Sequence, residues 1–193
     1  LALLPQGARV GTSAPRRAAQ LLDARPDCIV VPIRGNVATR MAKLQAGEAD
    51  ATFLAAAGLA RLGESGVGTR LNPEDWLPAP AQAAIGIECR ADDTGTRELL
   101  AAIDHPPSRA EVLAERALLA ALGGNCHSPI AALSRSEGGR ITLSAAIYSP
   151  DGAERIAAED SFPAADEAAP ARLAGRLLAS APDSVTAHFS GPA

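Results

Sequence analysis

Short apolar stretches alternate with amphipathic ones in the first third of the chain, and this order limits the possible fold more than any other feature. The stretches Ala8–Gly11, Cys28–Ile33 and Ala51–Ala55 predict buried strands. Each is followed, after a short connection, by a segment with helical periodicity. Strand–helix repeats of this kind are typical of a mostly parallel sheet covered by helices. We therefore expect an α/β fold in this part of the chain.

The residues beyond position 62 show a different pattern, with more turn-forming residues. Positions 64–80 are rich in glycine and proline and predict a loop that ends in the linker LPAPAQ. The turn Ser149–Gly152 lies between two expected strands, at 141–148 and 153–162, and predicts a β-hairpin. The other expected elements are a strand at Ala83–Cys89 and helices at Thr94–Ile103, Ser108–Leu122 and Ala165–Ser180, with Ser108 and Glu111 as a capping box. The C-terminal part should therefore form a small α+β domain.

Arginines gather at the starts of two predicted helices, which is the unfavourable end of a helix for a cation. Arg16 and Arg17 fall in the first turn of the first helix. In the stretch IRGNVATR, Arg34 precedes the expected N-cap Asn36, and Arg40 lies one turn into the helix. Helix starts that follow parallel strands meet at the carboxyl edge of the sheet and are suited to binding anions. The pattern favours a cleft for a polyanion over the alternative of solvated surface arginines.

Carboxylates fit this predicted cleft as well as phosphates do, because arginine binds both through paired hydrogen bonds. The phosphate-binding patterns GxxxxGK[ST] and GxGxxG are absent from the sequence. The net charge is −4, which argues against nonspecific binding to nucleic acid. No apolar run approaches the length of a membrane span. We therefore expect a small-molecule partner and neither a nucleic acid nor a membrane.

Cys126 lies in a turn, within the stretch GGNCHSP, where no helix or strand is expected. The other two cysteines, Cys28 and Cys89, fall in predicted strands and are expected in the core. Three widely spaced cysteines do not indicate a disulfide framework or a zinc site, and they fit a cytoplasmic protein. The end of the preceding helix carries a partial negative charge that disfavours a thiolate. A hydrolase-type nucleophile is therefore poorly supported, and an ordinary turn cysteine stays the alternative.

Six separated blocks of the sequence resemble the porphobilinogen deaminase (hydroxymethylbilane synthase) family. In order, they are GTSAPRRAAQL, IRGNVATRMAKL, AAAGLARLG, LPAPAQAAIGIECR, AERALLAAL and GGNCHSPIAA. The resemblance begins at about Pro5 and corresponds to the C-terminal two-thirds of the family's chain. The absence of an initial methionine agrees with a piece of a longer protein.

The resemblance implies a role for Cys126, which would carry a dipyrromethane cofactor through a thioether bond. It also implies that this cofactor's acetate and propionate groups are bound by Ser13, Arg16, Arg17 and Arg40. Substrate binding or chain elongation is implied for Arg34, Arg40, Arg61, Arg90 and Arg116, although a structural ion pair is an alternative role for the last three. No metal ligand is implied.

The implied activity is that of a transferase in porphyrin and haem biosynthesis. Four porphobilinogen molecules would be condensed head to tail on the dipyrromethane primer, with loss of ammonia, and released as hydroxymethylbilane. In the family an aspartate that lies upstream of all six blocks assists the departure of ammonia. We therefore assign no catalytic acid within these residues and expect the 193-residue chain alone to be inactive.

The implied architecture has three domains, of which the larger two are doubly wound like periplasmic binding proteins. Residues 1–79 would form most of domain 2, residues 80–103 a returning segment of domain 1, and residues 104–193 a small α+β domain that anchors the cofactor. A monomer is expected. The rival hypothesis is a non-enzymatic anion-binding module of the periplasmic-binding-protein type, which needs no role for Cys126.

Several positions differ from the family pattern. Ala14 stands where the family often has serine, and Asn125 where it has a small residue. Ala81 and Ala83 flank Gln82 in place of two glycines. The two added methyl groups are expected to restrict φ and ψ and to stiffen a hinge between domains.

Overall fold

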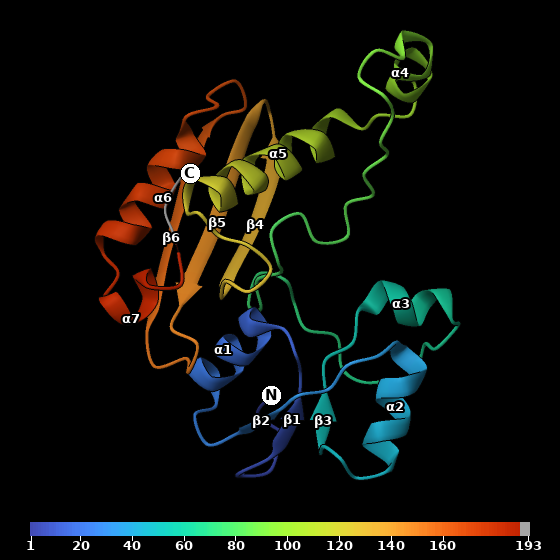
Figure 1. The fold of residues 1–193 in the computed structure, drawn as a ribbon, viewed down its shortest axis with the longest axis vertical. Coiled ribbons are helices and arrows are strands. Elements are labelled where there is room, and N and C mark those ends of the chain that lie inside the picture. The colour runs from blue at the N-terminus through green and yellow to red at the C-terminus, as the bar shows by residue number, and fades with distance from the viewer. Residues whose placement is uncertain (190–193) are drawn as a thin grey trace.

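The computed structural model describes residues 1–189, which contain two separate three-stranded sheets (Figure 1). The first sheet is parallel and is formed within the first 52 residues, and the second is antiparallel and lies after residue 129. The protein is therefore a mixed α/β protein, and the prediction of strand–helix alternation followed by an α+β part is confirmed at this level. No helix in residues 1–189 is long and apolar enough to cross a membrane.

The parallel sheet has the strand order β2-β1-β3 and consists of β1 (Arg9–Gly11), β2 (Ile29–Val31) and β3 (Ala51–Thr52). Each strand is followed by a helix, namely α1 (Pro15–Ala24), α2 (Val37–Gln45) and α3 (Ala56–Arg61). A small core of buried apolar residues, made of Ala8, Val10, Leu21 and Cys28, joins this sheet to α1. Since the three strands run in one direction, the starts of all three helices lie at one edge of the sheet.

Gly11, at the end of β1, allows the chain to pass close to Ile33. A Cβ atom on Gly11 would overlap the Cδ1 atom of Ile33, so only glycine fits without a shift of this buried side chain. The close packing brings the connection after β1 next to the connection after β2. These two connections lead into the helix starts at which the sequence predicts the arginines.

The antiparallel sheet has the strand order β4-β5-β6 and consists of β4 (Ile130–Glu137), β5 (Arg140–Tyr148) and β6 (Arg155–Pro163). The helices α5 (Pro106–Ala121) and α6 (Ala169–Ala179) cover one face of it, and α7 (Asp183–Thr186) follows them (Figure 1). The main core lies between these helices and the sheet, with Leu118, Leu143 and Leu173 fully buried. The pairing of Tyr148 with Arg155 confirms the predicted hairpin at Ser149–Gly152.

The opposite face of the antiparallel sheet contacts α1. Ala131 and Ala146 of the sheet pack with Tyr148 against Ala19 of α1, and Leu77 joins this small cluster. This contact explains why the sequence did not predict β4. Ile130 and Ala132 face the main core while Ala131 faces α1, so the strand begins with an apolar run instead of an alternation.

The predicted capping box of α5 is wrong. The helix begins at Pro106, two residues earlier than expected, and its N-cap is His105, whose Nδ1 atom accepts a hydrogen bond from the Ser108 N–H at 3.3 Å. Proline suits the first position of a helix because it has no N–H to leave unpaired. The Glu111 carboxylate instead accepts a hydrogen bond from the Ser136 N–H at 2.8 Å, which ties α5 to β4. The last long helix, α6, likewise begins at Ala169 and not at Ala165.

The predicted strand Ala83–Cys89 is not a strand in the structure. None of the strands in residues 1–189 pairs with it, so its backbone has no ladder of hydrogen bonds, and Ile85 is 80% exposed. The prediction that Cys89 is a core residue is therefore wrong, whereas Cys28 is buried as expected. The following helix α4 (Thr94–Ala101) has no buried residue and lies apart from both sheets (Figure 1).

Candidate functional site

The carboxyl edge of the parallel sheet places Arg16 and Arg17 at the second and third positions of α1, as predicted. Pro15 begins this helix, and Ala14 offers no side-chain cap. Arg16 is only 7% exposed. Its Nη1 atom donates to the Leu77 carbonyl oxygen at 2.8 Å, and its Nη2 atom donates to Oε1 of Gln82 at 3.3 Å. Both partners come from the linker, about sixty residues further along the chain.

No carboxylate among residues 1–189 forms an ion pair with Arg16. Burial, and to a lesser extent the charge of Arg17, lowers the pKa of Arg16 to about 10. The guanidinium is therefore still charged at neutral pH, although it is buried beside another cation. A buried charge with neutral partners alone is unfavourable, and an anionic ligand would relieve that cost.

Arg17 and Arg40 add two further cations to this region. The Arg17 guanidinium lies over the ring of Phe53 at 5.9 Å from its centroid, and that ring stacks on Trp76 at 5.1 Å. Burial and the charge of Arg40 lower the pKa of Arg17. The Arg40 Nε atom donates to the Gly35 carbonyl oxygen at 2.8 Å. We refer to Arg16, Arg17 and Arg40 as the arginine cluster.

Several arginines elsewhere in the chain differ from this cluster because they have acidic partners. Arg25 forms an ion pair with Asp27 at 2.7 Å, and Arg172 forms one with Asp166 at 2.6 Å. Four more arginines are paired in the same way, namely Arg9, Arg109, Arg155 and Arg176. The cluster, in contrast, is a group of cations without an ion pair among residues 1–189.

The other predicted residues lie at varying distances from the cluster along the fold. Ser13 is on the connection after β1, and its hydroxyl donates to the Ile33 carbonyl oxygen at 3.1 Å. Arg34 is exposed on the connection after β2, just before Asn36, which accepts a hydrogen bond from the Thr39 N–H as an N-cap. The structure does not bring the remaining three predicted arginines together with the cluster. All three are exposed: Arg61 lies at the end of α3, Arg90 before α4 and Arg116 on α5.

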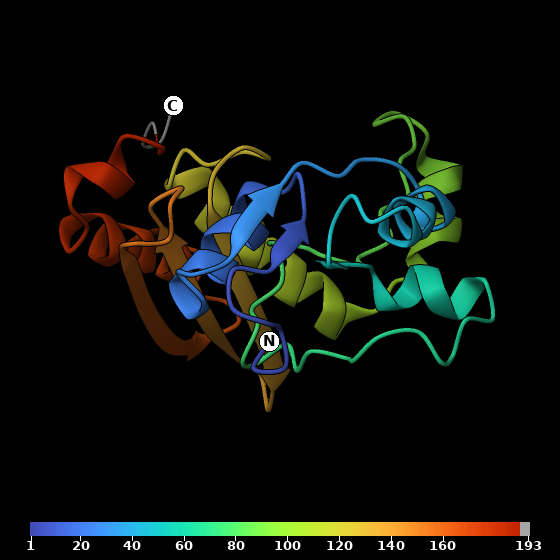
Figure 2. The ribbon, with the colours of Figure 1, turned by 90° about the horizontal axis from the view of Figure 1, so that it is seen from below.

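Cys126 is exposed and free, in the loop between α5 and β4. The Asn125 side chain accepts a hydrogen bond from the His127 N–H at 2.8 Å, and the Ser128 hydroxyl accepts one from the Asn125 N–H at 3.0 Å. These bonds fold the loop tightly around the cysteine. Figures 1 and 2 both show this loop close to the start of α1. The loop that contains Cys126 and the helix that carries Arg16 and Arg17 therefore belong to different halves of the molecule but are neighbours in space.

The linker between the two sheets has an unusual backbone. Ala81 and Ala83 have φ angles of 58° and 70°, in the left-handed region that favours glycine. Gln82 lies between them and contacts Arg16. A hinge in this stretch stays a prediction of the resemblance, and the sequence did not predict Gln82 and the Leu77 carbonyl as partners of Arg16. Both contacts join residues far apart in the sequence. The only local signal was that Ala81 and Ala83 stand where the family pattern has glycine.

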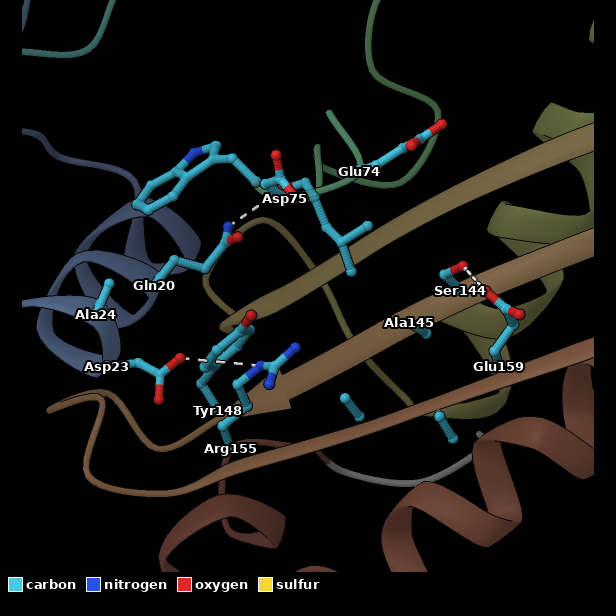
Figure 3. A pocket seen from close by; sticks show the side chains of 14 residues that line it. Gln20, Asp23, Ala24, Glu74, Asp75, Ser144, Ala145, Tyr148, Arg155 and Glu159 are labelled. Carbon is cyan, nitrogen blue, oxygen red and sulfur yellow. Dashed lines mark hydrogen bonds and ion pairs between the residues drawn. The ribbon is translucent and has the colours of Figure 1, made fainter. Parts of the chain in front are cut away.

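A cavity of about 580 Å³ lies elsewhere, between α1 and the outer face of β5 and β6 (Figure 3). It is lined by Gln20, Trp76 and Tyr148 together with the acidic side chains of Asp23, Glu74, Asp75 and Glu159. Arg155 is its one basic lining residue and is 3.8 Å from Asp23. Burial raises the pKa of Tyr148. An acidic wall of this kind does not suit a polyanion.

Fold and site together define a class: a mixed α/β protein with arginines at a helix start and an exposed thiol in a nearby loop. Comparison with known families identifies the member of that class. The family model described as "Porphobilinogen deaminase, dipyromethane cofactor binding domain" matches residues 1–98, and "Porphobilinogen deaminase, C-terminal domain" matches residues 109–179. The chain belongs to the porphobilinogen deaminase family.

Curated relatives agree with this assignment. The porphobilinogen deaminase of Sphingopyxis alaskensis is 56% identical over 188 residues, which cover 97% of this chain and 59% of the relative. That of Paracoccus denitrificans is 54% identical over 86% of this chain and 53% of the relative, and that of Desulforudis audaxviator is 51% identical over 91% and 57%. The matched chain spans less than two thirds of the length of each.

Proposed function

We propose that the chain takes part in the reaction for which its relatives are named, the deamination and condensation of porphobilinogen. In this proposal a cytoplasmic, monomeric transferase joins four porphobilinogen molecules head to tail with loss of ammonia and releases hydroxymethylbilane. Porphobilinogen carries carboxylates, and the growing chain is a polyanion. The observation that carries the proposal is the arginine cluster, which is charged, partly buried and without a carboxylate partner among residues 1–189.

The residues present fit a dipyrromethane cofactor. Cys126 offers an exposed thiol for the thioether bond, in a loop that lies near the start of α1. We assign the cofactor's carboxylates to Ser13, Arg16, Arg17 and Arg40. The bound group would supply the primer to which the substrate units are added. The protein's part is to hold the carboxylates of primer and product in fixed positions through charge-assisted hydrogen bonds.

Substrate carboxylates are assigned to Arg34, Arg40, Arg61, Arg90 and Arg116. Arg34 and Arg40 flank the start of α2 and lie beside the cluster along the chain. The other three are exposed and form no ion pair among residues 1–189, so their guanidinium groups are available to an anion. They would bind successive units of the growing chain, and the acid that assists loss of ammonia is not assigned to any of these residues.

We further propose the domain division 1–79, 80–103 and 104–193. The parallel sheet and its helices end at Arg61, and the antiparallel unit begins with α5 at Pro106. Between them, residues 83–103 contain no buried residue. A segment with Ile85 and Ile87 exposed, and with no sheet partner in residues 1–189, is well explained if it packs on a separate unit.

The test is the intact mass of the protein expressed from its own gene. A covalent dipyrromethane should be present in the wild type and in Cys89→Ser, and absent from a folded Cys126→Ser variant. Cys89 is the matched control because it is also exposed and free. A wild-type protein without added mass would favour the rival, a non-enzymatic anion-binding module. An adduct mapped to Cys28 or Cys89 would contradict the assignment of Cys126.

A further inference from the structure

Glu115 is a buried acid in the middle of α5, only 7% exposed. One carboxylate oxygen accepts hydrogen bonds from the Ser134 N–H at 2.8 Å and from the Ser134 hydroxyl at 2.7 Å. The other accepts a hydrogen bond from the Ala81 N–H at 2.5 Å. A single carboxylate therefore joins α5, β4 and the linker, and its charge is balanced by donors and not by a cation.

The linker is restrained at Ala81, where its backbone conformation is unfavourable. Ala81 has a φ of 58°, in the left-handed region that is unfavourable for alanine. Such a conformation persists only where the surroundings fix it. The bond from Ala81 to Glu115 provides one such restraint, and the bond from the Ala132 N–H to the Pro78 carbonyl oxygen at 2.9 Å provides another.

The residue after Ala81 contacts the arginine cluster. Gln82 accepts hydrogen bonds through its Oε1 atom from Arg16 and from the Ala79 N–H, both at 3.3 Å. The second acceptor for Arg16 is the Leu77 carbonyl oxygen, which is also in the linker. The orientation of this buried guanidinium thus depends on where the linker lies.

We propose that Glu115 is a positioning residue for the anion site: it fixes the linker so that Gln82 and Leu77 hold the Arg16 guanidinium in one orientation. It touches no ligand and acts through Ala81, Gln82 and Arg16. The inference rests on the proposed function only in taking a porphobilinogen carboxylate as the anion that Arg16 binds.

The first arm of the test needs no ligand. Amide hydrogen exchange, measured by NMR on the 193-residue chain, should be slow at Ala81 and Ala79 in the wild type and faster at both in Glu115→Gln. Glutamine has one acceptor oxygen in place of the two of glutamate, so it cannot accept hydrogen bonds from both Ser134 and Ala81 in the same way. Glu111→Gln is the matched control, because Glu111 lies one turn earlier on α5 and bonds β4 through Ser136 but has no hydrogen bond to the linker.

The second arm measures binding of porphobilinogen through the fluorescence of Trp76, the one tryptophan of the chain. Trp76 stacks on Phe53, over which Arg17 lies, so its emission reports on the cluster. Couplings carried through intermediate residues are about 0.5–2 kcal/mol, so Glu115→Gln should weaken binding about 2- to 30-fold. Glu111→Gln should bind as the wild type does. Gln82→Ala and Glu115→Gln should be non-additive, because both remove the same restraint.

Each outcome decides a separate question. Unchanged exchange at Ala79 and Ala81 in Glu115→Gln would overturn the inference, as would faster exchange with unchanged binding. If the wild type itself gives no response to porphobilinogen, the proposed function fails for this chain, and the exchange arm still decides whether Glu115 fixes the linker. Glu115→Asp, one methylene too short to reach both Ser134 and Ala81, is the second variant if Glu115→Gln does not fold.

Discussion

At the scale of single residues, arginine serves two purposes in this protein, and the difference lies in its neighbours. Arg25 has Asp27 two positions away and forms an ion pair with it. Arg16 and Arg17 instead lie at the start of a helix that follows a parallel strand, and from this position the sequence predicted an anion site. The burial of Arg16 could not be predicted, because Leu77 and Gln82 come from a linker that lies far away in the sequence.

Replacing Arg16 by leucine should impair the binding of porphobilinogen carboxylates. Hydrogen bonds to charged groups contribute about 1.5–3 kcal/mol, so we expect affinity or cofactor loading to fall by about 10- to 150-fold. Arg16→Lys should also be impaired, because lysine lacks the two-pronged geometry of the guanidinium. Arg9→Leu is the control, since Arg9 is paired with Asp50 away from the cluster. Loading and binding equal to wild type in Arg16→Leu would refute the anion site.

Replacing Ala81 and Ala83 by glycine should stabilise the linker. A left-handed alanine costs roughly 1–2 kcal/mol, and glycine loses about 0.5–1 kcal/mol more entropy on folding, so each change should raise the free energy of unfolding by about 0.5–1 kcal/mol. Ala79→Gly, at a linker alanine without a positive φ, should lower it. Urea unfolding of the three variants gives the comparison, and a loss of stability in Ala81→Gly would contradict the strained backbone.

At the scale of elements, periodicity predicted the strands that have a solvent face or lie within the parallel sheet and failed for two others. The strand β4 is apolar on both faces at its start, because α5 and α1 cover opposite sides of it. The segment Ala83–Cys89 shows a strand-like composition, yet no strand of residues 1–189 lies beside it. A sequence pattern shows which face of an element is apolar, but it does not show which neighbouring element covers that face.

The start of the parallel sheet should be sensitive to acid through Asp27. Hydrogen bonds from Arg25 and from the Gly7 N–H lower the pKa of Asp27 in the folded protein. Asp27 therefore stabilises the fold above the pKa of an aspartate in the unfolded chain, near 3.9, and this stabilisation is lost as the pH falls below that value. Asp27→Asn should lose less stability between pH 7 and pH 3 than the wild type does. Asp92→Asn, at an exposed acid, is the control. The loss of stability is measured by urea unfolding at the two pH values. Equal losses in Asp27→Asn and in the wild type would contradict the role of the Arg25–Asp27 pair.

At the scale of the whole molecule, two separate cores are joined by a thin contact between α1 and the antiparallel sheet, and by the linker. Gly152, in the β5–β6 turn, lies against α1: a Cβ atom there would be 2.5 Å from the Asp23 nitrogen and 2.6 Å from the Ala19 carbonyl oxygen. Both atoms belong to the backbone of α1, so an added Cβ atom could be accommodated only by a shift of the whole helix away from the turn. This turn therefore sets how closely the two halves approach.

Gly152→Ala should separate the two halves without unfolding either. Gly139→Ala is the matched control, because Gly139 also has a positive φ, of 75°, but has nothing within 4 Å of an added Cβ atom. Overpacking costs about 1–3 kcal/mol beyond the backbone strain that both variants share. We expect faster amide exchange in α1 and a larger radius in small-angle scattering for Gly152→Ala alone. The same profile in both variants would show that the contact does not hold the halves together.

The exposed segment 83–103 has a consequence for how the two halves find each other. As a tether of about twenty residues it keeps them at an effective concentration in the millimolar range, so a contact too weak to hold free partners still forms within one chain. Trypsin can reach Arg90 and Arg97, which are exposed within this segment. A single cut there would leave two pieces, each with its own sheet, whose association becomes dependent on protein concentration. The chain therefore behaves as a complex of two weakly associating units that the segment 83–103 joins covalently.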